Sequence, residues 1–281
     1  MSDLTVWCDG SLRDPDAPVV TADDHGLTVG DGVFETCGVV RGQAFALTRH
    51  VRRLERSAAG LGLPAPDEDL VRAGVAAVLA ARPDAGRVRI TMTAGRAPLG
   101  SQRAGAPPSV IVAAGPGAPA AEAAVVRVPW VRNERSAVAG LKTTSYAENV
   151  VALAFARARG ATEALLANTR GELCEGTASN VLVERDGEVL TPPLSSGCLA
   201  GITRELVLEW GRAAGLPVRE ATLPYAVLDD VAAGRGGLAV TGSVVTLAPA
   251  VSLDGAPVTP GELSRALRDI YRARALEDVD P

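Results

Sequence analysis

A stretch rich in Pro, Gly and Ala divides this chain into two parts. Residues 113–123 read Ala-Ala-Gly-Pro-Gly-Ala-Pro-Ala-Ala-Glu-Ala. Pro lacks the backbone N–H group that helices and sheets use, and Gly is conformationally permissive, so this stretch supports neither element. The pattern predicts a small N-terminal domain over residues 1–113, a linker over 114–123 and a larger domain over 124–281.

Hydropathy patterning on both sides of the linker predicts an α+β fold. In the first domain we expect helices from an N-cap at Thr48 to Gly60 and from Asp67 to about Ala81, with strands at 4–8, 32–40, 87–93 and 109–113. In the second we expect helices at 146–159, 203–215 and 260–274, a hairpin over 163–174, and mainly antiparallel strands at 124–129, 180–184, 189–190, 218–221 and 238–241.

Charge and composition favour a small-molecule partner. The 281 residues are 47% hydrophobic and 22% charged with a net charge of -5, so we expect a folded protein without a broad surface for nucleic acid or membrane. The four Cys are far apart and there are two His, so neither a metal site nor a disulfide framework is indicated. The sequence starts without signal-peptide features and contains no apolar run of ~20 residues, which predicts a cytoplasmic location.

Lys142 is the sole Lys among 28 basic residues. A G+C-rich genome is one explanation for Arg at the other positions, but it does not explain the exception. Arg stays protonated because its pKa exceeds ~12, whereas burial lowers the pKa of Lys from ~10.4 until a neutral amine attacks a carbonyl. Lys142 is therefore a candidate nucleophile, forming a Schiff base either with a substrate or with pyridoxal phosphate (PLP).

A PLP site also needs donors for the phosphate and a carboxylate for the ring nitrogen. Residues 199–203 run through a Gly into a helix, and residues 241–244 form a turn with Gly and hydroxyl groups after a strand. Arg53 and Glu175 supply a candidate cation and a candidate carboxylate. Each feature alone is more typical of an ordinary helix start, turn or surface residue, and only their occurrence with the sole Lys favours a cofactor site.

Five segments in order along the chain resemble the class IV aminotransferases, which are fold-type IV PLP enzymes. These segments are Gly30–Glu35, His50–Ser57, Gly140–Asn149, Glu175–Asn180 and Leu199–Arg204. The resemblance spans about residues 4–250. It implies a two-domain fold like that of D-amino-acid aminotransferases, with residues 124–281 as the PLP-binding domain, a homodimer, and an active site between the domains.

The resemblance also implies a role for each matching residue. Lys142 would form the Schiff base and carry the proton at the reactive carbon, and Glu175 would pair with the ring nitrogen. The remaining matches fall into four roles: phosphate ligands (Arg53, Ile202, Thr203 and Ser243), an apolar contact with the ring face (Leu199), neighbours behind the cofactor (Ser179 and Asn180) and a contact with the phenolic oxygen (Tyr146).

Residues expected near the substrate distinguish the reactions that members of this family catalyse. Branched-chain enzymes are expected to carry Gly-Gly-Asn-Tyr after the Lys, where residues 143–146 read Thr-Thr-Ser-Tyr. D-amino-acid enzymes commonly carry Tyr in place of Phe34 and an Arg-x-His carboxylate site, where residues 87–90 read Arg-Val-Arg-Ile. Residues 30–36 and 142–149 look most like lyase-type members, so we expect a folate-pathway lyase that converts 4-amino-4-deoxychorismate to 4-aminobenzoate and pyruvate.

That amino-acid-like substrate carries two carboxylates, so cationic residues are expected near it. Arg96 and Arg103, in the loop over 93–103, are the candidates, with Phe34 as a further substrate residue. Two alternatives stay open: a D-amino-acid or amine transaminase, and a non-catalytic PLP-binding protein. The presence of both Lys142 and Glu175 argues against the non-catalytic alternative.

Overall fold

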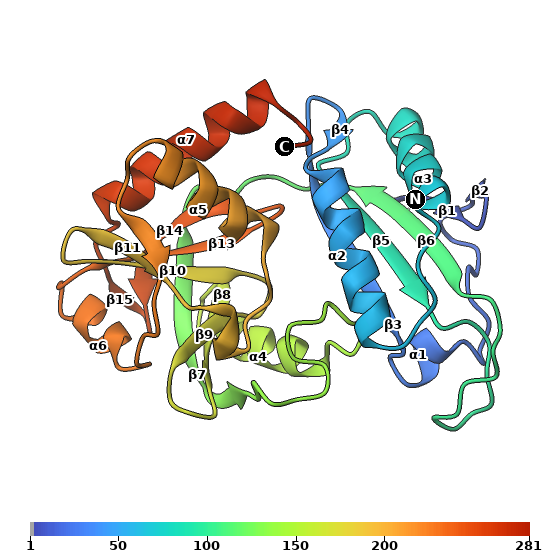
Figure 1. Ribbon diagram of the computed structural model, residues 1–281, viewed down its shortest axis with the longest axis horizontal. Coiled ribbons are helices and arrows are strands. Elements are labelled where there is room, and N and C mark those ends of the chain that lie inside the picture. Colours follow the sequence, from blue (N-terminus) through green and yellow to red (C-terminus); the bar gives the residue numbers. More distant parts are fainter. Residues whose placement is uncertain (1–2) are drawn as a thin grey trace. The chain divides into compact units, whose positions relative to one another are not determined.

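The computed structural model describes residues 3–281, which form two compact units (Figure 1). Of the described residues, the N-terminal unit contains 3–118 together with Leu141–Tyr146 and Ala275–Pro281. The C-terminal unit contains Pro119–Gly140 and Ala147–Arg274. The segment that carries Lys142 and the end of the chain therefore both pack with the N-terminal unit, although the sequence pattern placed them in the domain over 124–281.

The N-terminal unit is built on an antiparallel sheet with strand order β2-β1-β6-β5-β3-β4. Its core lies where Val33, Ile90 and Val112 meet the buried faces of two helices, because alternate residues of each strand point to one face. The strands are β1 (Thr5–Cys8), β2 (Ser11–Arg13), β3 (Gly32–Val40), β4 (Gln43–Ala44), β5 (Arg87–Thr93) and β6 (Ser109–Gly115), and the helices are α1 (His25–Thr28), α2 (Leu47–Gly60) and α3 (Glu68–Ala81).

The two long helices of this unit begin in different ways. Asp67, which the sequence placed in the first turn of this helix, is the N-cap of α3, since its side chain accepts a hydrogen bond from the Leu70 N–H at 3.0 Å. The predicted N-cap of α2 at Thr48 is wrong. Thr48 lies inside the helix, and the N-cap is Ala46, which has a left-handed backbone (φ 54°, ψ 37°) and makes no side-chain capping bond within the described residues.

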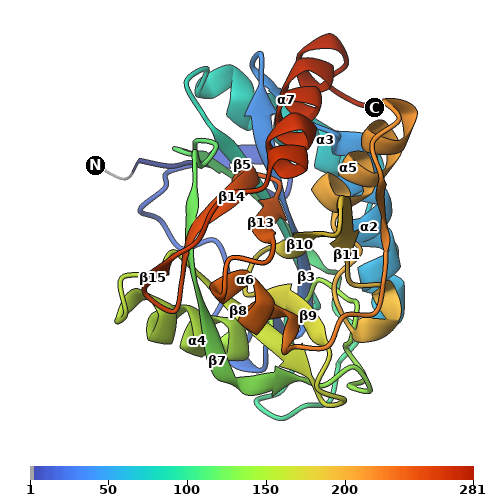
Figure 2. The same ribbon diagram turned by 90° about the vertical axis from the view of Figure 1, so that its left-hand side faces the viewer.

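The C-terminal unit contains a mixed sheet with strand order β12-β11-β10-β13-β14-β7-β8-β9, with β15 paired to β14 (Figure 2). Parallel pairs occur at β7 with β8, β7 with β14 and β11 with β12, and the other pairs are antiparallel. The strands are β7 (Ala123–Arg132), β8 (Glu163–Asn168), β9 (Leu173–Gly176), β10 (Asn180–Arg185), β11 (Glu188–Thr191), β12 (Val218–Glu220), β13 (Gly237–Gly242), β14 (Thr246–Leu253) and β15 (Ala256–Pro257). The helices are α4 (Ala147–Arg157), the 3-10 turn η1 (Leu194–Ser196), α5 (Ile202–Ala213), α6 (Val227–Ala232) and α7 (Glu262–Glu277).

The sequence pattern missed some of these elements for identifiable reasons. Strand β14 contains Pro249, which usually argues against a strand inside a sheet, and α6 is too short to show helical periodicity. In α4 the apolar Val150 and Val151 are 62% and 51% exposed, while Ala152 and Ala156 are buried.

Within the described residues, no helix combines the length and the apolar character needed to cross a membrane.

Candidate active site

The expected site residues fall into two groups, one in each unit. In the N-terminal unit, Leu141–Tyr146 runs along β3 and α2. The carbonyl oxygen of Lys142 accepts a hydrogen bond from the Phe34 N–H at 3.0 Å, and the Lys142 N–H donates to Ser57 Oγ at 3.1 Å. Thr144 is fixed in the same way, because its N–H donates to the Gly32 carbonyl at 2.8 Å. The backbone of the sole Lys is therefore held by a strand on one side and a helix on the other.

The side chain of Lys142 lies among aromatic rings and a second cation. Its Nζ atom is 4.3 Å from the centroid of the Phe34 ring and 5.8 Å from that of Tyr146, and these two rings meet edge to face at 5.2 Å. The guanidinium carbon of Arg89 lies 3.7 Å from the same Phe34 centroid. Although Arg89 is exposed, partial desolvation beside Phe34 lowers the pKa of its guanidinium, and Tyr146 raises it. The Phe34 ring therefore has the Lys142 amine and the Arg89 guanidinium beside it.

Arg53 lies in a fully buried ionic cluster with Glu35 and His50. Both oxygens of Glu35 accept from Arg53, Oε1 from Nε at 2.7 Å and Oε2 from Nη2 at 2.7 Å. His50 Nδ1 lies 2.6 Å from Glu35 Oε2. Burial raises the pKa of Glu35, but the attraction of Arg53 and His50 outweighs it and holds the pKa well below its usual range. Burial lowers the pKa of His50, although Glu35 raises it, and because an ionised carboxylate only accepts, the Nδ1 atom donates to Glu35.

In the C-terminal unit, two expected residues, Glu175 and Asn180, contact the backbone of a third, Leu199. Its N–H donates to Glu175 Oε2 at 2.9 Å, and its carbonyl oxygen accepts from Asn180 Nδ2 at 2.9 Å. Glu175 also accepts from Arg132 Nε at 3.2 Å. Arg132 in turn donates to Asn149 Oδ1 at 3.0 Å. The Glu175 carboxylate is therefore held in place by a main-chain N–H and a guanidinium.

Glu163 organises the loop between β9 and β10. This buried carboxylate accepts bonds from the Thr177 N–H at 2.9 Å, the Ala178 N–H at 3.3 Å and Ser179 Oγ at 2.7 Å, and from the Thr177 hydroxyl. A Cβ atom on Gly176 would lie 2.9 Å from the Glu163 carboxyl carbon, so only Gly fits this approach. Ser179, expected behind the cofactor, is thus tied to Glu163.

The N-terminus of α5 carries donors that suit an anion. Its N-cap is Gly201, which makes no side-chain capping bond within the described residues, and the buried Ile202 and Thr203 follow. Thr203 hydrogen-bonds Tyr271, whose pKa burial raises to about 12. On the adjoining strand β13, Thr241 stands opposite Asn180, and its buried Oγ1 has no hydrogen-bond partner within the described residues. An uncapped helix start beside an unsatisfied hydroxyl fits a phosphate group.

Ser243, the other expected phosphate donor, lies in the turn between β13 and β14. Strand β14 begins after this turn at Thr246, whose φ of 62° is unusual for a β-branched residue. Ser243 follows Thr241 by two residues and so belongs to the same end of β13. Its proposed contact with phosphate remains a prediction.

Arg96 and Arg103 hold other partners in this structure. Arg96 is 69% exposed and pairs with Asp23 at 3.0 Å. Arg103 donates to both oxygens of Asp31, at 2.7 and 2.6 Å, and to the carbonyl oxygens of Leu61 and Gly62. A substrate carboxylate would have to displace these acceptors.

Sequence reasoning missed several residues that surround the expected ones. In the sequence, Arg89 stood out only within a run that departs from Arg-x-His. No pattern linked Glu35 to His50 and Arg53, or Glu163 to the loop after Glu175. Both acidic residues carry a sequence signal, because Glu35 lies inside a mainly apolar strand and Glu163 begins one, and an acidic residue in such a strand is unusual unless it is paired. Which partners they find depends on contacts distant in sequence.

The family model for amino-transferase class IV matches residues 32–253, and the chain therefore belongs to this family. It is 29% identical to the bifunctional aminodeoxychorismate lyase / D-amino acid transaminase of Mycobacterium tuberculosis, over 98% of this chain and 100% of that protein. It is 28% identical, over 96% of each chain, to a Methanocaldococcus jannaschii protein described as a branched-chain-amino-acid aminotransferase. These similarities confirm the predicted class of enzyme.

Solved structures agree with this result. The fold IV-transaminase CpuTA1 of Curtobacterium pusillum superimposes with a TM-score of 0.83 and 31% identity, covering 99% of this chain and 100% of that one. A hypothetical aminotransferase from Mycobacterium tuberculosis in its PLP-bound form gives 0.84 and 27%, covering 98% and 99%. The predicted α+β fold of fold-type IV and the predicted cofactor, PLP, are both confirmed.

The residues present fit this cofactor. The uncapped start of α5 and the unsatisfied Thr241 hydroxyl suit its phosphate, and the anionic oxygens of Glu175 suit a protonated ring nitrogen. Lys142 is the chain's sole primary side-chain amine for its aldehyde.

Proposed function

We propose that this protein is a PLP-dependent aminotransferase that moves the amino group of a D-amino acid to a 2-oxo acid. The observation that carries the proposal is the cluster at Phe34, where Arg89 lies 3.7 Å and Lys142 Nζ 4.3 Å from the ring centroid. One guanidinium beside the reactive amine suits a substrate with one α-carboxylate next to its amino group. The name of the bifunctional Mycobacterium tuberculosis relative supports the D configuration.

In this proposal PLP supplies an aldehyde that condenses with amines and a ring that accepts the electron pair left at the substrate carbon. With the cofactor bound, Lys142 Nζ would take up and give back the substrate proton, and its backbone is fixed by Phe34 and Ser57. Glu175 keeps the ring nitrogen protonated. Arg53, Ile202, Thr203 and Ser243 hold the phosphate, with Thr241 as an added donor. Leu199 packs against the ring, and Tyr146, Ser179 and Asn180 complete its surroundings.

Aminodeoxychorismate lyase activity, the reaction favoured by the sequence, is the second candidate. The bifunctional relative's name supports it. The bonds that Arg96 and Arg103 make to Asp23 and Asp31 weigh against it, because those residues were to recognise the two carboxylates of that substrate. A homodimer and a cytoplasmic location stay part of the proposal, and light scattering of the purified protein tests the first.

Product identity tests the proposal. Purified holoenzyme is incubated with D-alanine and 2-oxoglutarate, with L-leucine and 2-oxoglutarate, and with 4-amino-4-deoxychorismate alone. We expect pyruvate and D-glutamate from the first mixture, resolved by chiral chromatography. Activity with L-leucine alone would show that the substrate is a branched-chain amino acid and not a D-amino acid. Formation of 4-aminobenzoate without amino transfer would show that the protein is the lyase.

A further inference from the structure

The end of the chain contacts the start of α2, more than 200 residues earlier in the sequence. The Ala46 N–H donates to the Val279 carbonyl at 2.7 Å. The Thr48 N–H donates to Asp280 Oδ1 at 2.8 Å, and the Thr48 hydroxyl donates to Asp280 Oδ2 at 2.6 Å. Arg49 Nε donates to the main-chain oxygen of Pro281 at 2.8 Å. Residues 279–281, which we call the tail, therefore cover the first turn of this helix.

Asp280 occupies the role that a capping side chain normally has. The first N–H groups of a helix lack partners within the helix, and an N-cap side chain usually accepts from the second or third of them. In α2 the N-cap is Ala46, which has no acceptor on its side chain, and Thr48 is the second residue of the helix. The Asp280 carboxylate serves that second N–H and also places a negative charge at the positive end of the helix dipole.

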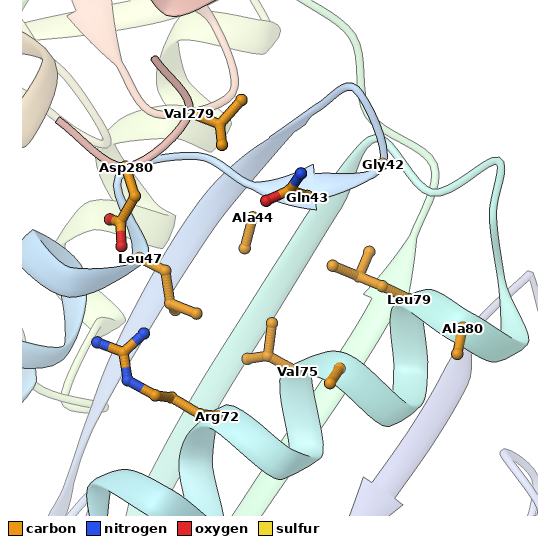
Figure 3. Close-up of a pocket in the computed structure, with 11 residues that line it drawn as sticks. Gly42, Gln43, Ala44, Leu47, Arg72, Val75, Leu79, Ala80, Val279 and Asp280 are labelled. Carbon is orange, nitrogen blue, oxygen red and sulfur yellow. The ribbon is translucent and has the colours of Figure 1, made fainter.

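Hydrogen bonds rather than close packing hold the tail here. A cavity of about 400 Å³ opens beside it, lined by Val279 and Asp280 together with β4, the start of α2 and the side of α3 (Figure 3). Arg72 and Asp280 extend toward the same end of this cavity, next to Leu47. Arg72 Nη2 donates to the Thr48 hydroxyl at 3.0 Å, so Thr48 links the carboxylate to a cation on α3. Loss of the Asp280 carboxylate would leave the Thr48 N–H without its acceptor and the tail with two hydrogen bonds to this turn, from Ala46 and Arg49.

The capped turn leads directly to the buried ionic cluster. The His50 N–H donates to the Ala46 carbonyl at 3.1 Å, so His50 belongs to the turn that Asp280 closes. His50 then contacts Glu35 at 2.6 Å, and Glu35 holds Arg53 through two bonds of 2.7 Å. Fraying of the first turn would release His50 and remove one of the partners that orient the Glu35 carboxylate.

We propose that Asp280 is a positioning residue: it caps α2 from the far end of the sequence and thereby sets the position of Arg53 for the cofactor phosphate. The second half of this inference rests on the proposed role of Arg53 in PLP binding. The first half rests only on the contacts within the N-terminal unit.

Three variants of the full-length protein test the proposal. Asp280→Ala removes the cap, Asp280→Asn keeps an acceptor of the same shape, and Glu277→Ala removes a charge from an exposed position just before the tail. In the apo-protein, we expect Asp280→Ala to speed amide hydrogen exchange in the first turn of α2 about fivefold, the usual effect of losing an N-cap. Asp280→Asn and Glu277→Ala should exchange like the wild type. Equal exchange in all four proteins would overturn the capping role.

PLP affinity tests the positioning role separately. Apo-protein is titrated with PLP and followed by tryptophan fluorescence, and we expect the dissociation constant to rise about threefold to fivefold in Asp280→Ala and to recover in Asp280→Asn. In an Arg53→Ala background, Asp280→Ala should raise it no further, because both changes act on one contact. Additive effects, or wild-type affinity in Asp280→Ala, would overturn positioning while leaving the proposed function intact. Failure of the wild type to bind PLP would overturn the proposed function and the positioning role together, and hydrogen exchange would still decide the capping role.

Discussion

Glu35 and Arg53 form a bidentate pair with both bonds at 2.7 Å, inside a part of the N-terminal unit where neither side chain is more than 5% exposed. Breaking such a pair is costly, because the remaining charge is left buried without compensation. The pair fixes Arg53 on α2 and explains why an Arg on an amphipathic helix, which usually faces water, points inward here.

The pH dependence of stability should report on His50. Burial lowers its pKa below the ordinary value of 6.5 in the folded state, so the unfolded chain binds the proton first. The free energy of unfolding is therefore highest above about pH 6.5 and falls as the pH drops below that value. The lowered pKa of Glu35 acts in the same direction at still lower pH. Urea unfolding at pH 7.5, 6.5 and 5.5 measures this, and His50→Gln should flatten the upper part of the curve. An unchanged slope in that variant would show that another group titrates.

Lys142→Ala should abolish amino transfer, with a loss of at least about 10³-fold, because the nucleophile and the proton carrier are removed together. Lys142→Arg should fail equally, since a guanidinium stays protonated. Borohydride treatment of the holoenzyme followed by peptide mass analysis should place the reduced cofactor on Lys142 in the wild type. Cofactor fixed to any other group would contradict the assignment.

Arg89→Met should lower kcat/KM for the amino acid about 10- to 100-fold, the usual effect of losing a charged hydrogen bond to a carboxylate. Most of the loss should lie in KM if the guanidinium binds the substrate and the product equally. Arg96→Ala is the matched control, because that exposed residue pairs with Asp23. If Arg96→Ala lowered kcat/KM more than Arg89→Met, the substrate carboxylate would bind to the loop over 93–103 instead.

Glu175→Gln should lower activity strongly while keeping the protein folded. The Gln side chain retains an acceptor for the Leu199 N–H but loses the negative charge that keeps a ring nitrogen protonated. We expect at least about 10²-fold lower kcat, comparable to the loss of a general acid–base contribution, with an altered visible spectrum of bound PLP. Full activity in this variant would mean that a group other than Glu175 keeps the ring nitrogen protonated.

Glu163→Gln should destabilise the C-terminal unit by about 1–3 kcal/mol, because several buried donors of the loop after Glu175 lose an anionic acceptor. Glu188→Gln, which alters an ion pair on the surface with Arg219, should change the stability by less than about 0.5 kcal/mol. Urea unfolding of both variants gives the comparison. Equal effects would mean that Glu163 contributes no more than a surface carboxylate.

Local patterns predicted much of the fold. Strand β3 has the predicted bounds, Gly32–Val40. The helix over Glu68–Ala81 likewise lies where local hydropathy and its acidic first turn predict it. These features depend on the alternation of apolar and polar side chains and on the intrinsic backbone preferences of each residue type. The predicted N-cap at Thr48 was wrong because the side chain that caps this helix is that of Asp280, which lies far from Thr48 in the sequence.

The sequence by itself determined the chemistry of this protein: a sole Lys, set among motifs in a family order, determines a PLP enzyme of class IV. The tertiary structure decided which side chains serve that chemistry. It placed Lys142 against β3 and α2, brought Arg89 over Phe34, buried Glu35 with Arg53, and committed Arg103 to Asp31. The physical reason is that nucleophilicity belongs to a residue type, whereas the partner of a charge depends on which groups are buried beside it.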